Sequence, residues 1–162
     1  MKFVTLVLLV LFSSKLLAAN TVDEVVNPIL LKIDKGEFKT IASDSFPDGS
    51  AMRQYISASD IKQLDSQMLS YLSTMGKSNG YQLYLTSDVP RIYEHRYYLF
   101  RFDRQPVIVK FEIYKANKSW EMHSVSLDFE LDSRMEESAK IRLGGMGLSD
   151  LRKNYEANKR LW

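Results

Sequence analysis

The stretch Glu94–Phe129, EHRYYLFRFDRQPVIVKFEIYKANKSWEMHSVSLDF, decides the fold. In its middle part every second residue is apolar from Val107 to Ile113, the period of a strand with one buried face. Two short polar connections, Asp103–Pro106 and Ala116–Lys118, have the composition of turns. The stretch therefore predicts an antiparallel meander of three strands, Glu94–Asp103, Val107–Lys115 and Trp120–Phe129.

The lengths of the two connections also predict a register for this meander. A register matters because a slip of one residue would move every side chain to the opposite face. The expected pairs across the two connections are Phe102–Val107, Phe100–Val109, Tyr98–Phe111, Val125–Val109, Leu127–Val107, His123–Phe111 and Glu121–Ile113. Both connections would then contribute to one continuous apolar face.

Residues 1–19 have the pattern of a secretory signal peptide. Lys2 precedes the apolar run Phe3–Phe12, which is too short to span a bilayer, and small residues follow it. Cleavage is expected after Ala18 or Ala19 and would leave no stable membrane anchor. It would also remove two of the 22 basic residues, which balances the 20 acidic ones. We therefore expect a secreted, most simply periplasmic, protein without a basic footprint for nucleic acid.

Helical patterns fill most of the region between this leader and the meander. Thr21 and Glu24 have capping-box spacing at the start of a first helix, which is expected to end at Gly36 with a kink or restart at Pro28. The other expected elements are a short helix over Glu37–Ser45, a longer one from Ser57 or Ser59 to about Met75, a strand over Tyr81–Thr86 and a linker over Ser87–Pro90. The order predicts an α+β fold, with N-terminal helices packed on a curved antiparallel sheet.

Three short motifs resemble one superfamily. Ile33–Phe38 is similar to the end of the first helix in small secreted bacterial members of the nuclear transport factor two-like, or cystatin-like, superfamily. Phe111–Lys115 with Ser119–Glu121 resembles their penultimate hairpin, and Val125–Phe129 their last strand. The resemblance implies a cone-like domain over residues 20–130 and leaves 131–162 as a C-terminal helical tail. Members include isomerases, dehydratases and pocketed domains without known chemistry, so the fold alone assigns no function.

The expected register gives the apolar face a hydrophobic floor with a polar rim, the usual layout of a ligand pocket. The expected ligand-binding residues are Arg96, Tyr98, Phe100, Phe111, Ile113, His123 and Val125. The leading hypothesis is a non-enzymatic binding or accessory domain for a small apolar ligand or a protein partner. The alternative is an isomerase- or lyase-like enzyme in which His123 is the base and Glu121 or Arg96 sets its pKa.

Other chemistries have little support in the sequence. The expected register separates His95 from His123, so no metal site is predicted, and no cofactor motif is found. The chain has no Cys, and Gly144–Gly147 lacks the Lys-Ser/Thr of a phosphate-binding loop.

The opposite sheet face is expected to be unusually aromatic. Its predicted contact residues are Tyr97, Tyr114, Trp120 and Met122. Such residues are enriched in interfaces, so a homodimer is expected, and a structural interaction protein acting through this face is a third reading of the function. The tail Asp150–Trp162 is an alternative cover for the same face.

Overall fold

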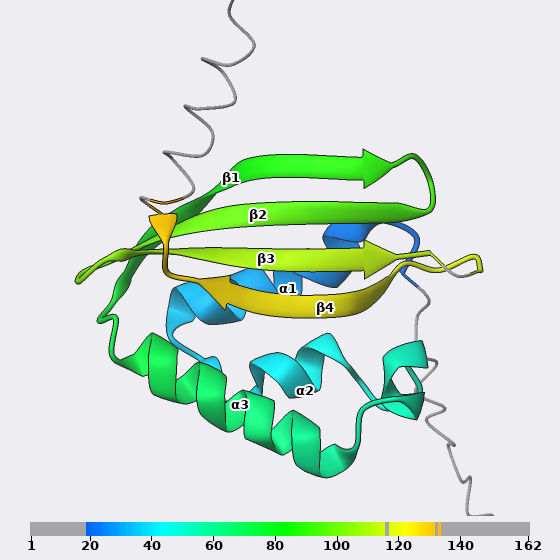
Figure 1. Ribbon diagram of the computed structural model, residues 1–162, viewed down its shortest axis with the longest axis horizontal. Helices are drawn as coiled ribbons and strands as arrows, with labels where there is room; N and C mark the ends of the chain where they lie inside the picture. The colour runs from blue at the N-terminus through cyan, green and yellow to red at the C-terminus, as the bar shows by residue number, and fades with distance from the viewer. Residues whose placement is uncertain (1–18, 116, 132, 134–162) are drawn as a thin grey trace, which may run out of the picture.

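The computed structural model describes residues 19–115, 117–131 and 133. The elements are α1 Val22–Lys35, the 3₁₀ helix η1 Phe38–Thr40, α2 Ile41–Ser45, the 3₁₀ helix η2 Ala51–Gln54, α3 Ala58–Ser73, β1 Ser78–Val89, β2 Tyr93–Phe102, β3 Pro106–Tyr114 and β4 Glu121–Asp128. The expected α+β class, with helices on a curved antiparallel sheet, is confirmed (Figure 1). The expected leader and nearly all of the expected tail lie outside the described residues.

The four strands pair in sequence order, β1-β2-β3-β4, each antiparallel to the next. Helix α1 lies across one face of the sheet, and α3 packs on η1 and α2 farther from it (Figure 1). Strand β1 is longer than expected, because Ser87 and Val89 pair with His95 and Tyr93. The expected linker over Ser87–Pro90 is therefore wrong for most of its length.

Local signals explain the bounds of α1. The side chain of Thr21 accepts a hydrogen bond from the Glu24 amide at 3.3 Å, whereas the Glu24 carboxylate accepts from Asn20 instead of closing a reciprocal capping box. Pro28 lies inside one continuous helix, so the expected restart is wrong. Gly36 ends the helix at φ 79°, in the left-handed region that glycine adopts without a steric penalty.

Helix α3 contributes a buried carboxylate as well as an apolar stripe. Ser57 and Asp60 form a capping box at its start. Asp65, one of the few buried polar residues, accepts from the amides of Ala42 at 2.7 Å and Ser43 at 3.3 Å, and also from the Ser43 hydroxyl. The carboxylate thus caps the start of α2 from a neighbouring helix.

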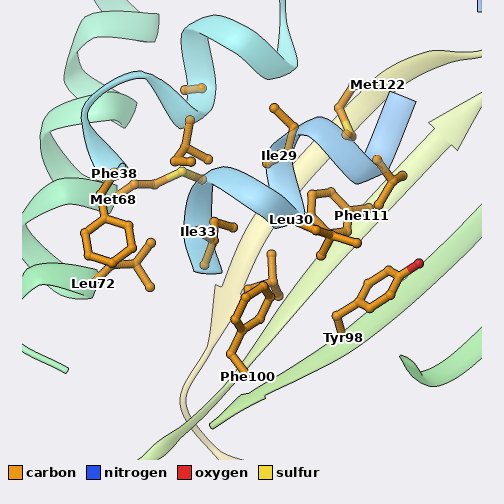
Figure 2. Packing of buried hydrophobic residues seen from close by; sticks show 14 of the residues in the cluster. Ile29, Leu30, Ile33, Phe38, Met68, Leu72, Tyr98, Phe100, Phe111 and Met122 are labelled. Carbon is orange, nitrogen blue, oxygen red and sulfur yellow. The ribbon is translucent and has the colours of Figure 1, made fainter. Parts of the chain in front are cut away.

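The core fills the space between α1, the other helices and the inner face of the sheet. Figure 2 shows Ile29, Leu30 and Ile33 of α1 facing the aromatic residues of β2 and β3. On the other side of α1, Met68 and Leu72 of α3 lie beside Phe38 (Figure 2). Met68 of α3 belongs to this core and is 6% exposed.

The register of the meander differs from the expected one by two residues. Phe100 pairs with Val107, and Phe111 pairs with Val125 and Arg96. A two-residue slip keeps every side chain on its face because the side-chain period of a strand is also two. The inner face is therefore as expected for β2 and β3, although each expected pair is wrong.

A β-bulge changes the faces at the start of β4. Glu112 pairs with Ser124, but the next residue, Ile113, pairs with Met122, so His123 is the extra residue. Beyond the bulge the inside and outside positions exchange. Met122 is consequently 3% exposed and belongs to the core, whereas His123 is exposed.

Candidate functional site

The aromatic residues expected to line a pocket are packed in the core. Tyr98 is 7% exposed, and Phe100, Phe111 and Ile113 are all 0% exposed. The Tyr98 and Phe111 rings meet edge to face at 5.9 Å (Figure 2). Val125 packs against the same cluster. These residues stabilise the fold, and none of them lines the cavity that is described below.

Arg96 is held by an ion-pair network on the inner face. Its Nε donates to Glu94 Oε1 at 2.5 Å, and its Nη1 donates to Asp23 in the first turn of α1. Burial opposes the charge, but the hydrogen bonds that the guanidinium donates to these carboxylates and to the Tyr98 hydroxyl raise the pKa of Arg96. The guanidinium therefore links the sheet to α1 through its Nε and Nη1 groups.

His123 lies on the outer face, which corrects its expected place beside Phe111. Its ring centroid is 6.1 Å from that of Tyr93 and 6.4 Å from that of Tyr114. His95 contacts the same Tyr93 ring at 4.9 Å and pairs with Glu112 across the strands. Both histidine rings therefore contact the ring of Tyr93, whereas the expected register had separated them along the strands.

The outer face carries a hydrogen-bonded group of charges beneath these rings. Burial raises the pKa of Tyr93 to about 12, together with its 2.7 Å hydrogen bond to Glu112. Burial works in the same direction on Glu112, but hydrogen bonds from Lys110 and Tyr93 lower the pKa of this carboxyl below its usual value. Glu112 in turn raises the pKa of Lys110. The face combines exposed and half-buried rings with a pair of opposite charges, Lys110 and Glu112, that neutralise each other.

The proposed catalytic group is not assembled. His123 contacts outer-face rings, Arg96 is paired on the inner face, and the Glu121 carboxylate accepts from the Ala51 amide at 2.8 Å. Within residues 19–115, 117–131 and 133, no contact joins any two of these side chains. The same part of the chain contains no group of three His, Asp or Glu side chains suited to hold a metal ion.

A cavity of about 420 Å³ opens at the edge of the core, between α1, α2, the loop that precedes η2, and the start of β4. Ligand pockets commonly have roughly 300–1,000 Å³. Its apolar lining consists of Ala19, Val25, Pro28, Ile29, Pro47, Trp120 and Met122. Figure 2 shows Ile29 and Met122 together at this end of the core. We call this space the α1–β4 cavity.

Polar groups surround the apolar part of the α1–β4 cavity. Lys32 is paired with Asp44, and its Nζ also donates to Thr40 at 3.1 Å. Glu24 and Glu121, by contrast, accept only from backbone amides among the described residues, those of Asn20 and Ala51. The rim is consequently acidic.

One buried hydroxyl of the cavity wall lacks a partner. Ser50 is 7% exposed and lines the cavity, and its Oγ is buried without a hydrogen-bond partner in the described part of the chain. Its neighbour in the wall, Ser45, donates to the carbonyl of Ile41 at 2.7 Å. A buried unpaired hydroxyl costs free energy, so Ser50 marks a place where a ligand group could bond.

Two expected interface residues belong to this cavity. Trp120 and Met122 line it, while Tyr97 and Tyr114 stay on the outer face. The bulge at His123 causes this division. A signal in the sequence does exist: the apolar positions change phase between Val125 and Met122, which is what an extra residue produces. The helical side of the cavity has no comparable signal.

Comparisons with known proteins give one fold-level likeness. No protein-family model matches the chain, and no curated protein matches it. A solved structure from Campylobacter jejuni, described as an NTF2-like (nuclear transport factor two-like) transpeptidase, is similar with a TM-score of 0.45 and 12% identity. The match covers 62% of this chain and 94% of that one. At this level it assigns neither a family nor an activity to this chain.

Proposed function

We propose that this protein is an exported binding or accessory domain, and that its α1–β4 cavity holds a small ligand with an apolar body. The observation that carries the proposal is the cavity itself: an apolar wall bounded by a few polar groups, one of which, Ser50 Oγ, is buried without a described partner. A preformed apolar space with few convergent polar groups is typical of small-molecule sites. We keep the binding hypothesis, but the proposed binding site lies at the edge of the sheet beside β4 and not on the sheet face.

Trp120 provides a direct assay, because the chain has only two tryptophans and the other is Trp162. In a Trp162→Phe background, titration with 1-octanol should change Trp120 fluorescence saturably. Val25→Phe adds a ring to the cavity wall and should abolish the change. Leu31→Phe is the matched control, since Leu31 is on the same helix but 49% exposed and does not line the cavity. Equal binding by the two variants would refute the site.

An enzyme of the isomerase or lyase kind stays the alternative, with less support. Its proposed base, His123, lies on the outer face of the sheet, whereas Glu121 lines the cavity on the inner side. Purified protein that turns over a substrate, and loses turnover in a folded His123→Ala variant, would reverse this order of preference.

A partner role for the outer face is the third proposal, with a different set of residues from the one that the sequence predicted. Tyr97 and Tyr114 remain on it and are joined there by Tyr93, His95 and His123. Adjacent rings that are exposed, as in Tyr114 and His123, or half-buried, as in the other three, favour contact with a second surface. Sedimentation equilibrium tests the homodimer, and a protein that stays monomeric at high concentration would exclude it.

Export rests on residues 1–19 and is tested by mass. None of the helices in the described residues is long and apolar enough to cross a membrane. Cleavage after Ala18 would keep the hydrogen bond from the Trp120 amide to the Ala19 carbonyl, at 2.9 Å, whereas cleavage after Ala19 would remove it. We expect the first product, and an intact mass that includes residues 1–18 would exclude processing.

A further inference from the structure

We infer that the ligand of the α1–β4 cavity is an amphiphilic cation, with an aliphatic or aromatic body and an amine that is positively charged at neutral pH. This inference rests on the proposed function, because it concerns the same cavity. The proposed function specifies only that the ligand has an apolar body, and the present inference specifies that it also carries a positive charge.

The arrangement of charges carries the argument. Three carboxylates, those of Glu24, Asp44 and Glu121, line the cavity together with a single ammonium group, Lys32. Lys32 pairs with Asp44, which leaves Glu24 and Glu121 without a basic side chain among the described residues. Lys115 lies nearby, over the Trp120 ring at 5.5 Å, but is not part of the lining. A ligand carboxylate would be repelled here, and an ammonium attracted.

Hydrogen-bond chemistry points in the same direction. Glu24 and Glu121 can only accept, and the Ser50 hydroxyl, whose donor and acceptor capacity are both unused among the described residues, can accept from an ammonium as well. An ammonium has donors and no acceptor, so it complements such a set. A carboxylate ligand would instead need donors, and the one charged donor of the lining, Lys32, is already bonded to Asp44 and Thr40.

Processing could supply an internal competitor for one carboxylate. Cleavage after Ala18 would place the N-terminal ammonium on Ala19, which lines the cavity and precedes Asn20, whose amide donates to Glu24 Oε2 at 2.8 Å, so this ammonium would pair with Glu24. Glu121 lies at the start of β4 and accepts from Ala51, so this pairing would leave it free to receive the ligand. Glu121 is therefore the residue to change, and the exported, processed protein is the sample to use.

The test compares three probes with the same chain: octylammonium, 1-octanol and octanoate, each titrated by calorimetry. Octylammonium should bind roughly tenfold more tightly than octanoate at low salt, and the difference should shrink as salt screens the rim. Glu121→Gln keeps an acceptor for the Ala51 amide and should lower octylammonium affinity severalfold without changing that of octanol. Glu37→Gln is the matched control, because Glu37 is exposed and outside the lining.

Each outcome has a defined meaning. Octanoate binding as tightly as octylammonium, or a Glu121→Gln variant that behaves like Glu37→Gln, would overturn the charge of the ligand. Equal binding of octylammonium and octanol would do the same while leaving the apolar site in place. Binding of none of the three probes would overturn the inference and the proposed function together.

Discussion

Replacement of Asp65 by Ala should be among the most destabilising single changes in the helical layer. Asp65 is 8% exposed, and its Oδ1 accepts from the buried Ala42 amide at 2.7 Å and the Ser43 amide at 3.3 Å. Its Oδ2 accepts from the Ser43 hydroxyl. These donors have no other hydrogen-bond partner among the described residues, so the alanine variant would leave them unpaired beneath α3.

The magnitude follows from the number of donors that lose a partner. A buried donor left unsatisfied costs about 1–3 kcal/mol, and the two amides differ in burial and geometry, so we expect a loss of about 3 kcal/mol. Asp65→Asn keeps one carbonyl oxygen for the amides and places its NH₂ beside the Ser43 hydroxyl, which can accept. We expect that variant to lose only about 1 kcal/mol.

Asp60 supplies the matched control because it also caps a helix but is exposed. Loss of an exposed cap typically costs about 1 kcal/mol. The measurement is urea unfolding followed by circular dichroism, with unchanged denaturant dependence showing that the compactness of both states is preserved. Amide exchange at Ala42 should also accelerate in Asp65→Ala. If Asp65→Ala costs no more than Asp60→Ala, the cross-helix cap contributes nothing and the reasoning is refuted.

Two further predictions test the sheet. Met122→Ala should cost about 2–5 kcal/mol, as for a buried methionine, while His123→Ala stays within about 0.5 kcal/mol in urea unfolding; a strand without the bulge would give the reverse order. Tyr93 has its pKa raised to about 12, chiefly by burial and then by Glu112, so the folded state holds its proton more tightly than the unfolded state. The resulting stabilisation is complete below pH 10 and is lost as pH rises toward about 12. Ultraviolet titration should show a tyrosine that ionises near pH 12 and that Tyr93→Phe removes; an unchanged titration would contradict this assignment.

The class of the fold could be predicted from the sequence because the signals for it are local. Capping residues, a glycine after the first helix and the alternation of the middle strand each fix one element through its own chemistry. Gly36 and Ser57, for example, act at the positions expected of them. Helix identity needed no knowledge of distant contacts.

The register could not be predicted because a shift of two residues leaves the alternation of apolar and polar residues unchanged. Pairing Phe100 with Val107 or with Val109 buries the same residues on the same face. Only the geometry of the connection between the strands separates the two choices, and a loop of four residues or fewer is compatible with both. Alternation therefore decides faces but not neighbours, and a site inferred from neighbours inherits that ambiguity.

The position of the site depended on a single residue of β4. With regular pairing, His123 would lie beside Phe111, and Trp120 and Met122 would lie outside; with His123 as an extra residue, the last two turn toward α1. The polar identity of His123, against the apolar identity of Trp120 and Met122, agrees with the bulged arrangement. Burial of the apolar pair favours that arrangement by roughly the free energy of two large side chains, more than one disrupted ladder position costs. The same preference that places the bulge therefore builds the β4 wall of the α1–β4 cavity.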